Sequence, residues 1–370
     1  MSSKSSQNEV TAIIVLHNNK KTIGTCLKHL LRGSVVPRIL MIDCGSKDGG
    51  ADAAREYLKA RFSDKKEKGT PYFVVELGVN TGRAHAFNTG VHMVSTPYVF
   101  SLSPEAAVSR RYVEKLLGCM KKLEKSGLHP LSVQGLITAG TGSGRGTTIR
   151  SAGWKLRPDY ICVHVAEGKD AGAFRDPGRV RRIPASDMSA SLYRMAVLSK
   201  VGLMDERLFG FNEDLDLGLR SSLLGHQSYL LPTAVARNYG PAEQTLFEKQ
   251  VIIGNLLYMQ YKYNRPAILQ NLLNNPAMSE DNGGSVRRGR TLCYMAEMEQ
   301  MEREQMDMSV TKLPLPDEFY MNTSWADSTL IYPLWLGERL PAPWEKTVDG
   351  IVQVWEKMAY GIEELRDKIV

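Results

Sequence analysis

A buried strand and the turn that ends it decide the fold of this chain: Arg38-Ile39-Leu40-Met41-Ile42-Asp43-Cys44-Gly45-Ser46-Lys47-Asp48-Gly49-Gly50. The short, continuous apolar run before Asp43 is typical of a strand that is covered on both faces. The Gly- and Asp-rich run after it predicts a tight turn. Asp43 is therefore expected at the carboxyl end of a buried strand.

The same kind of strand alternates with helix-spaced segments on both sides of this stretch. Strands are predicted at 10–16, 38–43, 72–77 and 98–102, and helices at 21–31, 51–61 and 80–94. This order predicts an α/β fold with a doubly wound, mostly parallel sheet flanked by helices. Ligands of such sheets bind beyond the carboxyl ends of the strands, where Asp43 and Ser103-Pro104-Glu105 fall.

The rest of the chain is predicted to complete this domain and to extend it. A Gly- and Arg-rich excursion at 138–182 is expected to carry loops over the open end of the sheet. Further strands and helices are predicted at 183–199, 227–236 and 246–263. We expect a disordered N-terminus (1–9), a main domain (10–273), a linker (274–290) and a mostly helical C-terminal extension packed on the main domain (291–370).

Composition restricts the class of protein. No apolar run reaches the roughly 18 residues of a membrane span. The polar start of the chain lacks the apolar core of a signal peptide, so a cytoplasmic protein is expected. The five cysteines are scattered and form no Cys-x-x-Cys pair, which argues against a disulfide framework and a structural zinc site.

The charge is unevenly distributed along the chain. Residues 296–370 carry 15 acidic and seven basic side chains, whereas residues 1–295 carry 25 acidic and 40 basic ones. A basic body suggests a polyanionic partner such as nucleic acid, an anionic membrane surface or a phosphorylated substrate. The alternative is a solvated basic surface that the acidic tail partly neutralises.

Three acids fall within four residues in the stretch Phe209-Gly210-Phe211-Asn212-Glu213-Asp214-Leu215-Asp216. On a helix, Glu213 and Asp216 share a face and Asp214 points elsewhere. Such crowding can raise the pKa of one carboxyl group, which suits a general base. The alternative is an acidic first helical turn that the helix dipole favours.

Taken in order, these motifs resemble the family 2 glycosyltransferases with a GT-A fold, in their rhamnosyltransferase-like subgroup. The resemblance covers about residues 10–265 and leaves the last hundred unexplained. The motifs that carry it are Thr11–Asn19, Ile42–Gly49, Asn80–Gly90, the Glu213-Asp214 pair and Pro232–Gly240.

The resemblance implies an inverting transfer of a hexosyl or deoxyhexosyl group from a nucleotide-diphosphate sugar to an acceptor hydroxyl. Asp214 would deprotonate that hydroxyl, with Glu213 beside it. Asp43 would hydrogen-bond the base or ribose of the donor. The positions implied in nucleotide-sugar binding are Val15, His17, Asp43, Gly82, Arg83, Asn88 and Ser103.

Three positions depart from the family pattern. The metal-binding Asp-x-Asp appears as Ser103-Pro104-Glu105, the second Asp of the strand-two turn is Cys44, and the late His is Asn238. Hard divalent cations prefer carboxylate and phosphate oxygens. Either Glu105 alone holds Mg²⁺ or Mn²⁺ with the diphosphate, or basic side chains replace the ion.

The sequence leaves alternatives open for the identity of the acceptor and for whether the chain is catalytic. A glycan or a lipid-linked precursor is what the resemblance implies. The basic body leaves a second acceptor open, a modified (hydroxymethylated) base in DNA, as in phage DNA hypermodification. The altered metal-binding positions favour a third alternative, a non-catalytic module that binds a nucleotide sugar.

Overall fold

The computed structural model describes residues 9–62, 72–140, 148–156, 162–174, 179–241, 245–263, 288–289, 291–293 and 295–296. The chain divides into two compact units. Unit 1 comprises residues 1–155, 164–209 and 213–240, and unit 2 comprises 156–163, 210–212 and 241–370. The predicted N-terminal disorder and most of the predicted linker and extension lie outside the described residues.

Unit 1 is built on one large mixed sheet with the strand order β10-β12-β6-β11-β4-β1-β2-β3. Two short strands join it at the side, β5 against β12 and β7 against β6. The strands are β1 (Val10–Leu16), β2 (Arg38–Asp43), β3 (Tyr72–Glu76), β4 (Tyr98–Leu102), β5 (Ala106–Val108), β6 (Pro130–Ala139), β7 (Ile149–Ser151), β10 (Arg181–Ile183), β11 (Ala190–Arg194) and β12 (Gln227–Asn238).

The predicted doubly wound, mostly parallel sheet is confirmed. β1 pairs in parallel with β2 and β4, β2 pairs in parallel with β3, and β6 pairs in parallel with β12. β11 runs antiparallel between β4 and β6. Apolar periodicity does not report strand direction, so the sequence left this reversal open.

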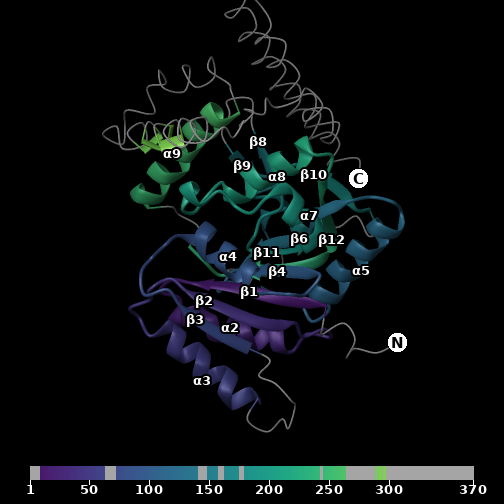
Figure 1. Cartoon of the computed structure of the whole chain (residues 1–370). Coiled ribbons are helices and arrows are strands. Elements are labelled where there is room, and N and C mark those ends of the chain that lie inside the picture. Colours follow the sequence, from purple (N-terminus) through teal and green to yellow (C-terminus); the bar gives the residue numbers. More distant parts are fainter. Residues whose placement is uncertain are drawn as a thin grey trace, which may run out of the picture. The chain divides into compact units, whose positions relative to one another are not determined.

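Helices cover both faces of the sheet (Figure 1). Side chains of β1 alternate between the two resulting cores, with Ile14 packing on one side and Ile13 on the other. One core is shared with α2 (Lys20–Leu31), α3 (Gly50–Phe62) and α5 (Tyr112–Lys125), and the other with α4 (Arg83–His92), α7 (Met195–Val201) and α8 (Glu213–Leu223).

Short elements occupy the Gly- and Arg-rich excursion and the turn before α8. They are β8 (Trp154–Leu156), β9 (Cys162–His164), α6 (Ala171–Phe174) and the 3₁₀ helix η1 (Glu206–Leu208). Residues 138–182 thus contain short strands and a short helix.

Helix α4 begins at Arg83, three residues later than predicted. The Asn80 Oδ1 atom accepts a hydrogen bond from the Gly82 backbone N–H at 3.1 Å, which closes a turn before the helix. Gly82 has φ 85°, in the left-handed region, so the helix cannot extend back through it.

Unit 2 contains α9 (Leu246–Lys262), which begins with a capping box between Thr245 and Glu248. The Asn255 amide on this helix donates hydrogen bonds to the carbonyls of Gly210 (3.0 Å) and Phe211 (2.8 Å). Among the described residues, no helix has the length and apolar character needed to cross a membrane.

Candidate active site

Asp43 lies at the end of β2, as predicted, and is 4% exposed. Its Oδ2 atom accepts a hydrogen bond from the Ser46 backbone N–H at 3.0 Å. Its Oδ1 atom is buried and has no hydrogen-bond partner among the described residues. Buried polar atoms are nearly always paired, so this oxygen is suited to a hydrogen-bond donor that the described part of the chain does not supply.

The His17 side chain connects the carboxyl ends of the neighbouring strands β1 and β2. It follows β1, whose Val15 pairs with Ile42 of β2. Its Nδ1 atom lies 2.9 Å from the Cys44 carbonyl oxygen, which can only accept, so Nδ1 carries the proton. In the neutral ring Nε2 is then an acceptor, and the Asn80 amide donates to it at 3.3 Å.

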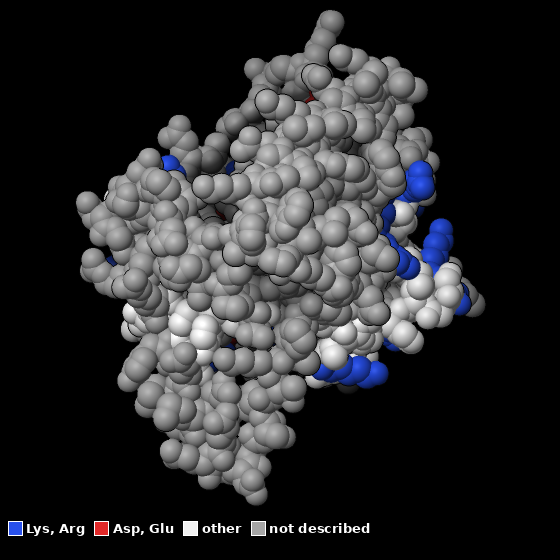
Figure 2. Space-filling model, turned by 90° about the horizontal axis from the view of Figure 1, so that it is seen from above, with Lys and Arg blue, Asp and Glu red and all other residues white. Residues whose placement is uncertain are grey.

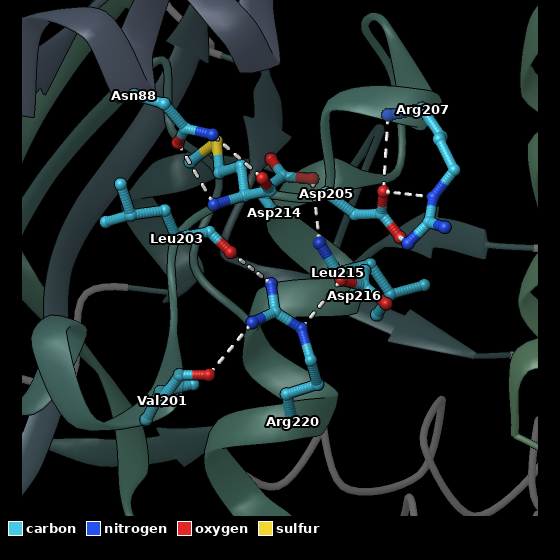
Figure 3. Close-up of polar contacts among 10 residues, drawn as sticks. Asn88, Val201, Leu203, Asp205, Arg207, Asp214, Leu215, Asp216 and Arg220 are labelled. Atoms are coloured by element: carbon cyan, nitrogen blue, oxygen red, sulfur yellow. Dashed lines mark hydrogen bonds and ion pairs between the residues drawn. The ribbon is translucent and has the colours of Figure 1, made fainter. Parts of the chain in front are cut away.

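Gly82 directly precedes α4, and Asn88 lies in the middle of that helix. A Cβ atom on Gly82 would lie 2.3 Å from the Phe209 carbonyl oxygen, so this position excludes other residues. The Asn88 amide is 4% exposed and exchanges two hydrogen bonds with the backbone of Met204, at 2.9 and 3.1 Å (Figure 3). In this structure Asn88 therefore holds the loop that leads to η1.

Arg83 and Glu213 join the start of α4 to the start of α8. The Arg83 Nε atom donates to Glu213 Oε1 at 2.5 Å. Glu213 is fully buried, and its Oε2 atom has no hydrogen-bond partner among the described residues. The structure therefore places these two predicted site residues in direct contact.

Asp214 is 3% exposed and its carboxylate accepts three hydrogen bonds. Oδ2 accepts from the Trp154 indole at 2.7 Å and from the Met188 backbone at 3.3 Å. Oδ1 accepts from the Leu215 backbone at 2.9 Å, the bond that Figure 3 shows. Burial raises the pKa of Asp214 to about 7, and the charge of Glu213 adds to that rise. A carboxylate with such a pKa is suited to accept a proton near neutral pH.

Asp216 has a different role from its two acidic neighbours. It is fully buried and accepts a hydrogen bond from Arg220 Nε at 2.9 Å. The same guanidinium donates to the carbonyls of Val201 (3.0 Å) and Leu203 (2.6 Å), as Figure 3 shows. Glu213 and Asp216 therefore each pair with an arginine, Arg83 and Arg220 respectively.

The Ser103-Pro104-Glu105 segment lies just beyond β4. The Ser103 Oγ atom accepts from the Glu105 backbone N–H at 3.2 Å, and Glu105 Oε1 accepts from the Asn19 amide at 3.4 Å. A Cβ atom on Gly240 would lie 2.1 Å from Glu105 Oε2, so the chain passes very close to this carboxylate. The side chain of Arg150 donates to the Gly240 carbonyl at 2.9 Å.

These residues alone do not form a complete metal site. Within the described ranges, no group of three or more His, Cys, Asp or Glu side chains is placed to hold a metal ion. Asn238, at the position of the family's late His, uses its Oδ1 atom to accept from the Gly240 backbone at 2.8 Å. The donor set around Glu105 fits Mg²⁺ or Mn²⁺ only if phosphate oxygens complete the coordination.

Three residues around Asp214 were missed by sequence reasoning: Trp154, His164 and Asp187. The Trp154 and His164 rings lie against each other with centroids 3.8 Å apart. His164 Nδ1 is 3.7 Å from Asp187 Oδ2. No motif or periodicity marked these positions as site residues; Asp187 fell inside the segment 183–199, which was predicted only as a strand and a helix.

The comparisons with known proteins agree with this architecture. Residues 11–137 match the family model described as glycosyl transferase family 2. No curated protein sequence matches the chain. GalNAc-T7, solved with UDP, GalNAc and Mn²⁺, has a similar structure, with a TM-score of 0.51 and 15% sequence identity over 83% of this chain and 58% of that one.

Two further solved structures are similar at a lower level. The mannosyltransferase PcManGT from Pyrobaculum calidifontis, in complex with GDP-Man and Mn²⁺, has a TM-score of 0.47 and 15% identity over 97% of this chain and 88% of that one. S. aureus TarS has a TM-score of 0.46 and 13% identity over 92% of this chain and 55% of that one. This chain thus spans little more than half the length of GalNAc-T7 and TarS. Its fold is the GT-A fold.

Proposed function

We propose that this chain, whose residues 11–137 match glycosyl transferase family 2, transfers a hexosyl or deoxyhexosyl group from a nucleotide-diphosphate sugar to an acceptor hydroxyl with inversion. The family match and the GT-A fold support a glycosyltransferase that uses a nucleotide sugar. The observation that carries the finer proposal is the buried Asp214 carboxylate, whose pKa of about 7 matches the task of a general base.

The donor nucleotide is assigned to the ends of β1 and β2. The unpartnered Asp43 Oδ1 atom accepts a hydrogen bond from the base or the ribose. The backbone around Val15 and His17 flanks the base, and the hydrogen bond from His17 to the Cys44 carbonyl keeps the two strand ends together. Both features support a preformed nucleotide pocket, which lowers the entropy lost on binding.

The transfer itself is a direct displacement. Asp214 takes the proton of the acceptor hydroxyl as its oxygen bonds to the anomeric carbon, and the bond from that carbon to the diphosphate breaks on the opposite side. The nucleoside diphosphate leaves and the configuration inverts. The three hydrogen bonds to Asp214 fix the carboxylate for this step, and precise placement is a large part of such catalysis.

A divalent ion, when bound, neutralises charge on the departing diphosphate. Glu105 is the residue we assign to it, together with the phosphate oxygens of the donor. The alternative is that cationic side chains such as Arg83, which is 36% exposed, supply this charge.

The acceptor is assigned to the Asp214 side of the site, and a glycan or lipid-linked precursor is the first candidate. A modified base in DNA is the second, and charge favours it. On the face drawn in Figure 2, the described side chains in view include several Lys and Arg and hardly any Asp or Glu. Lys and Arg side chains of this kind would contact the phosphates of DNA.

A thermal-shift screen of UDP-, GDP- and dTDP-sugars, with and without Mn²⁺, tests the donor assignment, because a bound ligand raises stability by mass action. Turnover by the native chain that Asp214→Asn abolishes supports the proposal and removes the non-catalytic alternative. Failure to bind any of these donors, or unchanged transfer by Asp214→Asn, would show that the proposal is wrong. Duplex binding at two salt concentrations separates the acceptors: no affinity at low salt excludes DNA.

A further inference from the structure

The Asp214 carboxylate is held by side chains that the displacement step does not use. Its Oδ2 atom accepts from the Trp154 indole of β8 and from the backbone of Met188, the residue that follows Asp187. We propose that Trp154, His164 and Asp187 form a positioning group that fixes the orientation of Asp214 and places a second carboxylate beside it. This inference rests on the proposed role of Asp214 as the base.

The loop that carries Asp187 is pinned to the sheet by polar side chains. Ser101 Oγ donates to the Met188 carbonyl at 2.7 Å, Ser191 Oγ donates to the Asp187 carbonyl at 2.5 Å, and the Asp187 backbone N–H donates to Gln134 Oε1 at 2.7 Å. These three side chains are in register across β4, β11 and β6.

All three of these polar side chains are at most 3% exposed. Polar groups in a core are costly unless they are hydrogen-bonded, and apolar residues would fill the same space at a lower cost in free energy. A buried polar row that bonds to one loop is explained by the need to hold that loop in one position. The loop in turn presents the Asp187 side chain and the Met188 N–H to the site.

The side chains of the proposed group contact one another in a chain. The Trp154 ring lies on the His164 ring, and His164 faces the Asp187 carboxylate at 3.7 Å. The other Asp187 oxygen, Oδ1, accepts from the Ser189 backbone N–H at 2.8 Å. Trp154 therefore contacts the Asp214 carboxylate through its indole N–H and the ring of His164, the partner of Asp187, through its ring face.

Two members of the group act on the charge of Asp214 in opposite directions. Burial is the main cause of the raised pKa of Asp214; Glu213 and Asp187 raise it further, while Arg83 and the Trp154 hydrogen bond lower it. The pKa of Asp187 itself is lowered: burial opposes this, but His164 and the Ser189 hydrogen bond outweigh it. Among the described residues, the groups that interact electrostatically with Asp214 include Glu213 (α8), Arg83 (α4), Asp187, the Trp154 indole and the Tyr193 hydroxyl (β11).

The test needs no substrate. Because the native pKa of Asp214 is raised, the native state keeps its proton where the unfolded state has lost it, so this carboxyl group lowers stability as the pH rises from about 4 to about 7 and has no further effect above. The melting temperature of the native chain is measured against that of Asp214→Asn between about pH 4 and pH 9. The pH at which this difference in melting temperature levels off, which we call the levelling point, reports the native pKa of Asp214.

The same difference is then measured in two variant backgrounds. With Asp187→Asn we expect the levelling point to move down by about one pH unit, and with Trp154→Phe we expect it to move up by a similar amount. Asp52→Asn, on the exposed face of α3, is the matched control and should leave the point unchanged. The two variants also predict opposite shifts in the pH profile of kcat/KM with whichever donor the screen identifies.

A purely structural role for these residues would lower the melting temperature without moving the levelling point. Unmoved points in both variants, or shifts in the same direction, would therefore overturn the proposal. An incorrect assignment of the transfer reaction would give a different result from an incorrect assignment of the positioning group. If Asp214 titrates as described and both shifts occur, but no nucleotide sugar is turned over, the positioning group stands and the transfer reaction does not.

Discussion

Arg83 on α4 and Glu213 at the start of α8 form an ion pair in which Glu213 is fully buried and Arg83 remains 36% exposed. The two residues are 130 positions apart in the chain. Arg83 supplies the cation that the buried Glu213 requires, and its charge also lowers the pKa of neighbouring Asp214. One side chain thus links the stability of the site to the protonation of its proposed base.

Replacement of Arg83 by Met tests this link. The variant leaves a buried carboxylate without its partner, so we expect a loss of about 1–3 kcal/mol in the free energy of unfolding. The pKa of Asp214 should rise as well, and activity should then appear only at higher pH. Chemical denaturation and a pH–rate profile measure the two effects. Arg55→Met is the control, because this arginine pairs with exposed acids on the surface and should cost less than about 1 kcal/mol.

The pH dependence of transfer follows from the pKa of Asp214. A base with a pKa of about 7 is protonated and inactive at low pH, so kcat/KM should rise with pH and level off above neutrality. Asp214→Asn should reduce kcat about 10²–10⁴-fold and abolish this dependence, with donor affinity little changed. An acid limb that persists in the variant would assign the ionisation to another group.

Donor binding should depend on the unpartnered oxygen of Asp43. Asp43→Asn replaces one carboxylate oxygen by an amide that donates, so a hydrogen bond from the base or ribose is lost or reversed. We expect the dissociation constant of the nucleoside diphosphate to rise about 10- to 100-fold, equivalent to about 1–3 kcal/mol. Calorimetric titration with UDP and GDP measures it. Asp52→Asn, whose side chain is 77% exposed, should bind as the native chain does.

Two glycines give a matched test of backbone strain. Gly82→Ala places a Cβ atom 2.3 Å from the Phe209 carbonyl oxygen at a residue with φ 85°, so the loop must move. We expect a loss of more than about 1 kcal/mol, together with weaker activity. Gly24→Ala, inside α2 with open space around it, should stabilise the chain by about 0.5–1 kcal/mol. Similar denaturation curves for the two variants would contradict this reading of the Gly82 contact.

The strands and their end residues were predictable because a buried parallel strand leaves a continuous apolar run that any single sequence displays. Asp43 was predicted at a strand end for this reason. The partners of the site residues were not predictable. Trp154 reaches Asp214 across 60 residues of chain, and nothing in the excursion around Trp154 marks it as a hydrogen-bond donor to a base.

The direction of β11 and the roles of the three clustered acids also separate what the sequence could predict from what it could not. Helical spacing placed Glu213 and Asp216 on one face, and it also places Arg220 one turn after Asp216, as an i,i+4 pair on α8. The partner of Glu213 is Arg83, which is 130 residues away in the chain and is brought there by tertiary packing. The local pattern of apolar and turn residues indicates which residues are buried and which lie at the end of a helix or strand. It carries no information on which distant side chain meets them.

The turn before α8 supplies the last prediction, within unit 2. Phe211 and Asn212 have φ values of 67° and 65°. This left-handed conformation costs a residue such as Phe211 about 1–2 kcal/mol, whereas asparagine adopts it more readily. Asn255 on α9 donates to the Gly210 and Phe211 carbonyls, and Arg288 donates to the Asn255 side-chain oxygen. Asn255→Ala should therefore release the strained turn, lowering the unfolding free energy by about 1–3 kcal/mol.

Activity should fall in the same variant, because Glu213 and Asp214 follow Asn212 directly in the chain and their placement depends on the backbone of that turn. We expect kcat to decrease more than donor affinity, since Asp43 lies on a different element. Lys249→Ala, an exposed position on α9, is the control and should change neither quantity. Full activity in Asn255→Ala, at a temperature where the variant is folded, would mean that the turn keeps its conformation without this support.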